Sequence, residues 1–140
     1  MIFERKKYLD ELIAGRGNGL VKIITGVRRC GKSFLLFDIW HNWLLEHGVT
    51  DNHIIEIQLD DFRNRRLRKP DALLDYIDSK VMDDGNPYYI VLDEVQLVED
   101  FVEVILSLTH MRNVDVYVSG SNSRFLSSDV VTEFRGRGDE

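Results

Sequence analysis

The stretch GVRRCGKS, from Gly26 to Ser33, constrains the fold of this chain more than any other. It fits the pattern G-x-x-x-x-G-K-[ST], in which the two glycines allow the backbone to turn tightly. The turned backbone points successive N–H groups inward, where they can bind an anion. Lys32 then places an ammonium group beside the phosphates, and the Ser33 hydroxyl is available to Mg²⁺. The stretch therefore predicts a phosphate-binding loop, which requires a strand before it and a helix after it.

Both flanks of the motif have the required pattern. The stretch LVKIIT, from Leu20 to Thr25, is short, apolar and rich in β-branched residues, which predicts a strand. The stretch SFLLFDIWHNWLLEHG, which starts with the last residue of the motif, carries apolar side chains over much of a helical circumference, as in a helix buried against a sheet. Trp40 and Trp43 are expected in the core under the sheet, and Gly48 is expected to end the helix.

The rest of the chain alternates between helix and strand patterns. Helices are predicted at 3–14, at 69–81 and after Asp100, and strands at 53–61, within 88–96 and from 114 onward. The run from 88 to 93 is apolar almost throughout, which is typical of a central strand of a parallel sheet that is covered on both faces. The 53–61 strand alternates apolar and polar residues and is expected to be less buried. Strands that alternate with helices predict the α/β class with a parallel sheet.

Two acids, Asp93 and Glu94, end the apolar run IVLDE. Because open α/β sheets bind ligands at the carboxyl ends of their strands, this pair is expected near the phosphates. Asp93 is expected to hold Mg²⁺ together with Ser33. Glu94 is expected to accept a proton from water and to direct that water at the γ-phosphate. A nucleotide kinase has less use for such a residue, because it must keep water out.

A further polar stretch, SGSNS at 119–123, follows the last predicted strand. If the two strands are neighbours, its loop lies beside Asp93, and Ser121 or Asn122 can hydrogen-bond the γ-phosphate or the attacking water. A polar turn that satisfies its own backbone explains the stretch equally well. Arg137, in FRGR, can stabilise a transferred phosphate from a neighbouring subunit, although its spacing alone favours a solvated arginine.

Together, GVRRCGKS, LDEVQ, SGSNSRFLSS and RGR resemble the AAA+ ATPases, in particular a prokaryotic family whose ATPase core precedes a C-terminal domain. The resemblance covers nearly the whole chain, including its opening FERKKYLDEL. It implies a P-loop three-layer α/β/α sandwich with a mostly parallel sheet, which binds ATP and Mg²⁺. It matches 26–33 to Walker A, 93–94 to Walker B, Asn122 to sensor 1 and Arg137 to an arginine finger that acts across a subunit interface.

The resemblance also sets the expected site residues and domain. Catalytic roles are expected for Glu94, Asn122 and Arg137, and metal binding for Ser33 and Asp93. The expected nucleotide contacts are Gly26, Arg28, Arg29, Cys30, Gly31, Lys32, Ser33 and Phe34. Residues 1–140 are expected to form one AAA+ core, truncated before the last core strand and the helical lid of the family. Self-association, and a protein client that is remodelled with ATP hydrolysis, are expected of the full-length protein.

Composition limits the class of protein. The chain has 140 residues, a net charge of −6 at pH 7 and a hydrophobic content of 44%, which suit one ordinary globular domain. No apolar run approaches the roughly 20 residues of a membrane span, and no signal peptide is visible, so we expect a cytoplasmic location and no membrane partner. Cys30 is the single cysteine, which excludes an internal disulfide. The four histidines lack a metal-binding spacing.

Three other functions stay open on the sequence. A P-loop kinase or GTPase shares the phosphate-binding loop, although the chain lacks the guanine signature N-K-x-D. A nucleotide-gated binding module would bind nucleotide without hydrolysing it. A nucleic-acid-associated P-loop protein would bind phosphates through the basic run at 63–69. Because Phe62 is the only aromatic residue beside that run, a solvated surface or a subunit contact is the better interpretation. The basic residues of the run are Arg63, Arg65, Arg66, Arg68 and Lys69.

Overall fold

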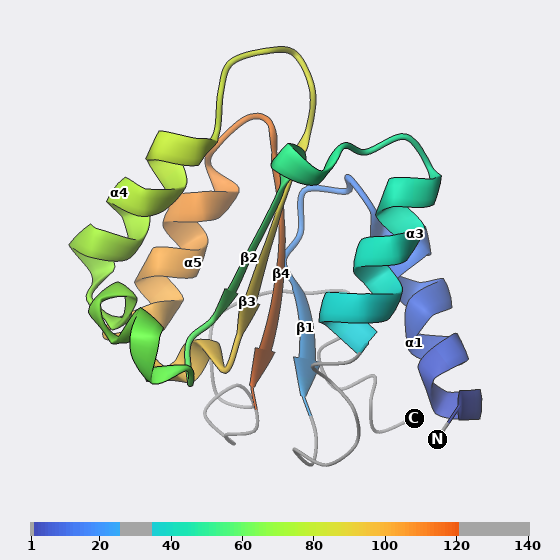
Figure 1. Cartoon of the computed structure of the whole chain (residues 1–140), viewed down its shortest axis with the longest axis horizontal. Helices are drawn as coiled ribbons and strands as arrows, with labels where there is room; N and C mark the ends of the chain where they lie inside the picture. The colour runs from blue at the N-terminus through green and yellow to red at the C-terminus, as the bar shows by residue number, and fades with distance from the viewer. Residues whose placement is uncertain (1, 26–34, 121–140) are drawn as a thin grey trace.

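Four parallel strands form one sheet in the order β1-β4-β3-β2. The computed structural model describes residues 2–25 and 35–120, and all four strands lie within these ranges. Their bounds are β1 Lys22–Thr25, β2 Ile54–Gln58, β3 Tyr88–Asp93 and β4 Val114–Gly120. The strands run side by side through the centre of Figure 1. The predicted α/β class and parallel sheet are therefore confirmed.

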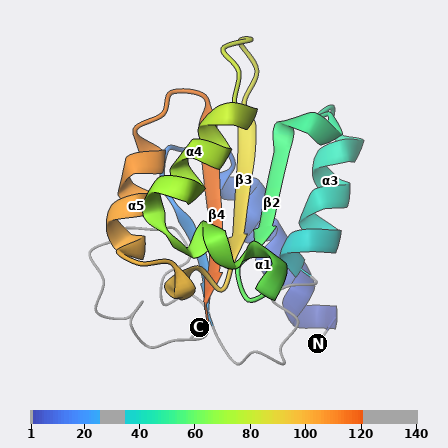
Figure 2. The same ribbon diagram turned by 60° about the vertical axis from the view of Figure 1, so that its left-hand side comes forward.

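Helices connect the strands and cover both faces of the sheet (Figures 1 and 2). The α-helices are α1 Ile2–Gly15, α3 His41–Glu46, α4 Pro70–Lys80 and α5 Phe101–Thr109. A π-helix, η2 Leu35–Trp40, precedes α3, and the 3₁₀ turns are η3 Asp51–His53, η4 Phe62–Arg68 and η5 Val95–Leu97. With α4 and α5 on one face and α1 and α3 on the other, the predicted three-layer sandwich is confirmed. No helix of the described ranges is both long and apolar enough to cross a membrane.

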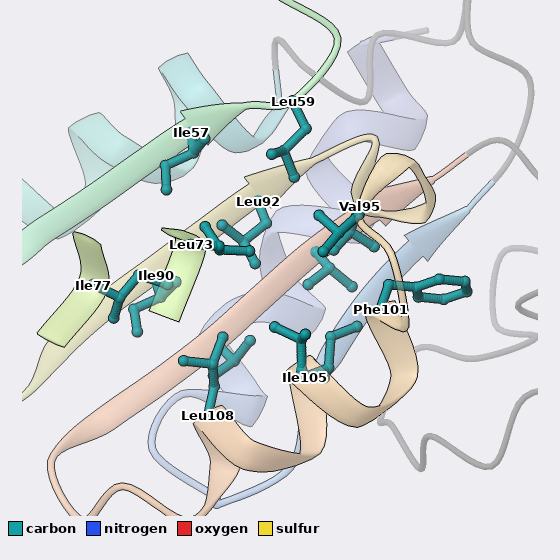
Figure 3. Close-up of a cluster of buried hydrophobic side chains, with 14 of the residues drawn as sticks. Ile57, Leu59, Leu73, Ile77, Ile90, Leu92, Val95, Phe101, Ile105 and Leu108 are labelled. Carbon is teal, nitrogen blue, oxygen red and sulfur yellow. The ribbon is translucent and has the colours of Figure 1, made fainter. Parts of the chain in front are cut away.

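The alternation of side chains along β3 divides the core into two clusters. Ile90 and Leu92 face α4 and α5 within the cluster that Figure 3 shows, whereas Tyr89 and Val91 face α1 and α3. All six residues of β3 are buried, as the continuous apolar run predicts for a central strand. Each fully buried aliphatic side chain contributes about 1.5–3 kcal/mol relative to an exposed one, so this strand is a large part of the stability.

Among the described residues, the helix predicted after GVRRCGKS is present as η2 followed by α3. Trp40 is buried and Trp43 is partly buried, with their rings stacked at a centroid distance of 5.2 Å. Gly48 ends the helix with a φ of +96°, a conformation that suits glycine. Val49 N donates to Leu44 O at 3.0 Å, which satisfies a carbonyl of the last turn. The predicted stop at Gly48 is therefore confirmed.

The strand predicted at 53–61 is shorter in the structure than in the sequence pattern. β2 covers only Ile54–Gln58, because His53 belongs to η3 and the chain turns after Gln58. Asp61 closes that turn by donating from its backbone N to Gln58 O at 3.2 Å. β2 lies at an edge of the sheet, and its residues alternate in burial. The lower burial expected of this strand is confirmed, and its predicted bounds are wrong.

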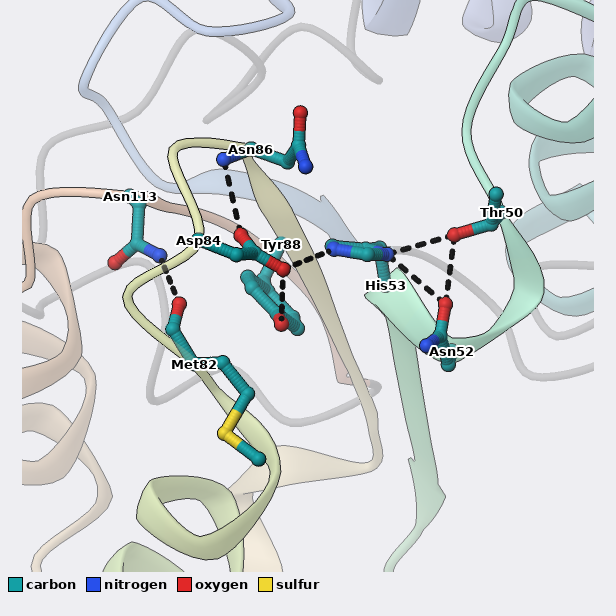
Figure 4. A network of polar contacts seen from close by, with 8 residues as sticks. All are labelled: Thr50, Asn52, His53, Met82, Asp84, Asn86, Tyr88 and Asn113. Atoms are coloured by element: carbon teal, nitrogen blue, oxygen red, sulfur yellow. Dashed lines mark hydrogen bonds and ion pairs between the residues drawn. The ribbon is translucent and has the colours of Figure 1, made fainter.

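A polar network joins the segments that precede β2 and β3 (Figure 4). His53 Nε2 lies 2.8 Å from Asp84 Oδ2, and the Tyr88 hydroxyl donates to the same oxygen at 3.0 Å. Asn86 N donates to Asp84 Oδ1 at 3.0 Å. The hydrogen bond from His53, followed by that from Asn86, holds the pKa of Asp84 below its ordinary value. The network therefore favours the ionised form of this carboxyl group in the folded state.

We expect Asp84→Asn to reduce the loss of stability at acid pH. Because the folded-state pKa of Asp84 is lower than the unfolded value of about 3.9, its contribution is complete above that value. The contribution is lost as the pH falls through the folded-state pKa. Urea unfolding between about pH 6 and pH 2 measures this, and Asp84→Asn should lose less free energy of unfolding than the wild type. The control is Asp83→Asn, at an exposed neighbour; equal slopes for all three proteins would contradict the prediction.

Candidate functional site

The carboxyl ends of β1, β4 and β3 meet at one edge of the sheet. β4 lies between the other two strands, and its Val118 is paired with Ile23 of β1 and with Leu92 of β3. β1 ends at Thr25, directly before GVRRCGKS, and β3 ends at Asp93. The structure therefore confirms that the segments after Asp93 and after β4 leave neighbouring strands, as the sequence analysis required. This is the edge at which open α/β sheets bind ligands.

Asp93 is fixed to the adjacent strand by Ser119. The Ser119 hydroxyl donates to Asp93 Oδ1, and both residues are buried. Asp93 O also accepts from Leu59 N at 3.1 Å, so the segment after β2 is tied to the same point. Hydrogen bonds thus hold both the side chain and the backbone of this buried residue, which gives its carboxylate the fixed position that a metal ligand requires.

Glu94 follows Asp93 in an uncommon backbone conformation. Its φ of 57° and ψ of 50° lie in the left-handed region, which costs a non-glycine residue on the order of 1 kcal/mol. Glu94 N donates to Ser119 Oγ at 3.1 Å, and Gln96 Nε2 donates to Glu94 Oε1 at 2.7 Å. Glu94 is buried, with 5% of its surface exposed. Strain at a buried, hydrogen-bonded carboxylate is typical of a functional position.

Comparison with known proteins assigns this chain to a protein family. A family model described as an AAA domain matches residues 18–140. The chain belongs to this AAA domain family. An uncharacterized protein of Haemophilus influenzae is 29% identical over 136 residues, which make up 97% of this chain and 34% of that protein. Uncharacterized protein MJ1544 of Methanocaldococcus jannaschii is 28% identical over 121 residues, or 84% of this chain and 24% of that protein. The chain thus spans a minor part of the length of both relatives.

Membership of the AAA domain family agrees with the resemblance found in the sequence, and it identifies a nucleotide-binding, ATPase-like domain. The four-stranded parallel sheet between helical layers agrees with that assignment. The match begins at residue 18, so it covers every strand of the sheet and the candidate edge.

The oxygen ligands at this edge of the AAA domain suit a magnesium ion bound together with phosphates. Mg²⁺ prefers oxygen ligands and is usually held by one or two carboxylates plus substrate phosphates. Asp93 and Glu94 provide two buried carboxylates in sequence, and the hydroxyl of Ser119 fixes the first of them. The residues of the AAA domain at the end of β3 therefore fit a hard cation of this kind.

Several of the predicted site residues lie outside the described residues. They are the expected nucleotide contacts Gly26, Arg28, Arg29, Cys30, Gly31, Lys32, Ser33 and Phe34, and the expected polar and cationic groups Ser121, Asn122 and Arg137. Of the predicted catalytic and metal-binding residues, Asp93 and Glu94 are described, and the structure brings them to the same edge. The roles assigned to the others stay predictions.

Two residues at the edge of the AAA domain were missed by the sequence analysis. Ser119 was included in the polar stretch at 119–123, but the phosphate contact was assigned to Ser121 or Asn122. The register of β3 and β4 brings Ser119 to Asp93, and no sequence spacing encodes that register. Gln96 was included in the quoted motif LDEVQ without a role. The available signal was a polar residue two positions after Glu94, for which the sequence predicts a catalytic role.

The basic run of the AAA domain lies in η4, which follows the carboxyl end of β2, and directly after η4. Arg68 Nε donates to Leu59 O at 2.8 Å, and the guanidinium of Arg63 is paired with Asp61 at 3.0 Å. Arg65 donates to Phe62 O at 3.0 Å, and Lys69 is paired with Glu99 at 2.6 Å. Four of the five basic side chains therefore have partners on this chain, which favours a structural surface over a phosphate-binding one.

Proposed function

We propose that this chain binds ATP with Mg²⁺ and that the full-length protein hydrolyses the ATP. The observation that carries the proposal is the buried pair Asp93 and Glu94 at the carboxyl edge, fixed by Ser119 beside the strand that leads into GVRRCGKS. In this proposal the Asp93 carboxylate would bind the metal ion, and the Glu94 carboxylate would bind and orient the attacking water. That division of roles separates hydrolysis from transfer to another acceptor.

Each residue has a defined role in the proposed reaction. The backbone of 26–33 and the Lys32 ammonium bind the β- and γ-phosphates. Ser33 and Asp93 would hold Mg²⁺, which neutralises developing charge on the phosphates when it is bound. Glu94 accepts a proton from the attacking water and directs that water at the γ-phosphate. Asn122 senses the γ-phosphate, and Arg137 acts from a neighbouring subunit.

Hydrolysis is proposed to drive a change in a protein client, with self-association of the full-length protein. Support for this step comes from the AAA domain family and from the predicted arginine finger, which acts in trans only if subunits meet. The relatives are about three and about four times as long as their aligned regions, which make up 34% and 24% of their lengths, and both are uncharacterized. We therefore propose a protein as the client, whose contact with this domain changes between the ATP-bound and the ADP-bound state.

We expect Lys32→Ala to weaken ATP binding by about 10- to 100-fold, the loss typical of a hydrogen bond to a charged group. Binding is measured at equilibrium with a fluorescent ATP analogue and the full-length protein, with GTP as a competitor. The matched control is Lys80→Ala, at an exposed lysine of α4, which should bind like the wild type. Equal affinities for all three proteins would remove Lys32 from the nucleotide site.

Removal of the metal tests the second part of the proposal. Excess EDTA should reduce phosphate release to background, and added Mg²⁺ should restore it, because the phosphate charge is otherwise uncompensated. Release of inorganic phosphate from ATP is measured with the full-length wild-type protein. Tight ATP binding without phosphate release in saturating Mg²⁺ would support a nucleotide-gated binding module instead.

A further inference from the structure

Gln96 lies in a short helical turn that begins directly at Glu94. η5 follows β3 at once, and Leu97 N donates to Glu94 O at 3.1 Å. Val98 N donates to Val95 O at 3.0 Å, and both valines are buried in the core cluster under α4 and α5. Gln96 is therefore flanked by two core anchors. Its side chain is carried by a fixed turn and not by a loose loop, which is a requirement for precise positioning.

The left-handed backbone of Glu94 brings the two side chains together. Glu94 is the residue directly before η5, its φ is 57°, and Gln96 Nε2 donates to Glu94 Oε1 at 2.7 Å. From the other side, Glu94 N donates to Ser119 Oγ at 3.1 Å. Hydrogen bonds thus hold both the main chain and the carboxylate of Glu94. The first holds the residue against β4, and the second sets the direction of its carboxylate.

The two ends of the Gln96 amide have different surroundings. Nε2 is bound to the Glu94 carboxylate, whereas Oε1 is buried and accepts no hydrogen bond from the residues that the structure describes. A buried amide oxygen without a donor is unfavourable, and in native proteins such an atom is explained by a functional role or by water. An acceptor beside the Glu94 carboxylate suits a water molecule, which can donate to both groups at once.

We propose that Gln96 is a positioning residue for hydrolysis, whose Nε2–H holds the Glu94 carboxylate in the orientation that accepts a proton from water. This inference rests on the proposed ATP hydrolysis and adds a residue to it. The Gln96 amide donates to Glu94 Oε1, and this hydrogen bond restrains the direction of the carboxylate group that is to accept the proton. Because a misplacement of about 1 Å in an active site can cost about 100-fold in rate, the loss of this restraint acts on kcat.

The first test uses Gln96→Met, which keeps the length of the side chain and removes the donor. We expect kcat for ATP hydrolysis by the full-length protein to fall by about 10- to 100-fold, with KM close to the wild-type value. The matched control is Gln58→Met, at the other glutamine of the chain, which is exposed at the end of β2. Gln58→Met should retain the wild-type kcat.

The second test uses Gln96→Glu, which keeps the shape and replaces the amide by a carboxyl group. Two adjacent carboxyl groups share a proton at mildly acidic pH, and the protonated one can donate to the other. The kcat of Gln96→Glu relative to the wild type should therefore fall as the pH rises and the shared proton is lost. A residue that only stabilised the turn would leave the shape of the pH profile unchanged.

The outcomes separate this inference from the function on which it rests. If the wild type releases no phosphate, the proposed function fails, and the role of Gln96 fails with it. If the wild type hydrolyses ATP and Gln96→Met keeps its kcat, the positioning role alone is overturned. A loss of kcat in folded Gln96→Met, together with the altered pH profile of Gln96→Glu, supports the role. Circular dichroism confirms folding, and if Gln96→Met does not fold, the pH profile of Gln96→Glu decides.

Discussion

Replacement of Glu94 by glutamine is expected to lower kcat for ATP hydrolysis by about 100- to 10,000-fold, the range for loss of a general base. The glutamine amide has nearly the shape of the glutamate side chain, but its oxygen does not accept a proton from water. ATP affinity should stay close to the wild-type value, because Glu94 is assigned to the water and not to the nucleotide. Phosphate release at saturating ATP gives kcat, and binding of a fluorescent ATP analogue gives the affinity.

The matched control for Glu94→Gln is Glu46→Gln, at an exposed glutamate at the end of α3. Both changes remove one negative charge, but only Glu94 lies at the carboxyl edge of the sheet. Glu46→Gln should hydrolyse ATP at the wild-type rate. Wild-type turnover in Glu94→Gln would remove the residue from its assigned role, and loss of ATP binding would assign it to the nucleotide instead.

The arrangement of the elements could be predicted from the sequence because it depends on local patterns. The apolar run at 88–93 is the clearest case, since only a strand that is covered on both faces buries every residue of such a run. The alternation around Ile55 and Ile57 predicted a less buried strand, and β2 lies at the edge of the sheet. The acid pair at the end of β3 was found in the same way, because the end of a buried strand predicts the ligand-binding edge.

The contacts that complete the site depend on strand register and backbone conformation, which the sequence patterns do not encode. Ser119 meets Asp93 because β3 and β4 pair in one specific register. The Gln96 side chain contacts Glu94, whose backbone is left-handed. Sequence patterns predict that conformation for glycine and not for glutamate. The burial of Lys22, in the middle of the apolar stretch LVKIIT, was likewise not predicted.

The second large effect is expected from Asp115→Asn, which leaves the charge of Lys22 without its partner. Lys22 Nζ lies 2.5 Å from Asp115 Oδ1, with 0% and 5% of the two side chains exposed. Asp115 Oδ2 also accepts from the Tyr117 hydroxyl at 2.6 Å and from Gly17 N at 2.8 Å. Burial, and then the charge of Asp115, raises the pKa of Tyr117, so its hydroxyl stays protonated and donates.

Loss of one partner of a buried ion pair costs about 3–5 kcal/mol, and we expect Asp115→Asn to lower the free energy of unfolding by that amount. Lys22→Met should cost less, because Asp115 keeps its two other donors, whereas the described partners of Lys22 are Asp115 and the Tyr117 ring. Urea unfolding of both single variants and of the double variant gives the coupling energy. The double variant should be more stable than the sum of the two losses predicts, by about 0.5–3 kcal/mol.

An exposed ion pair gives the control for this cycle. Lys69 and Glu99 lie 2.6 Å apart, a separation like that of the buried pair, but their side chains are 67% and 57% exposed. Because solvent screens such a pair, Glu99→Gln should leave the unfolding curve unchanged. If Asp115→Asn also left the free energy of unfolding unchanged, burial would not govern the energy of the contact between Lys22 and Asp115. A strong effect at Asp115 and none at Glu99 would instead show that burial makes this contact strong, and through Gly17 N the same carboxylate binds the loop after α1 to β4, the strand paired with β1 beside the nucleotide edge.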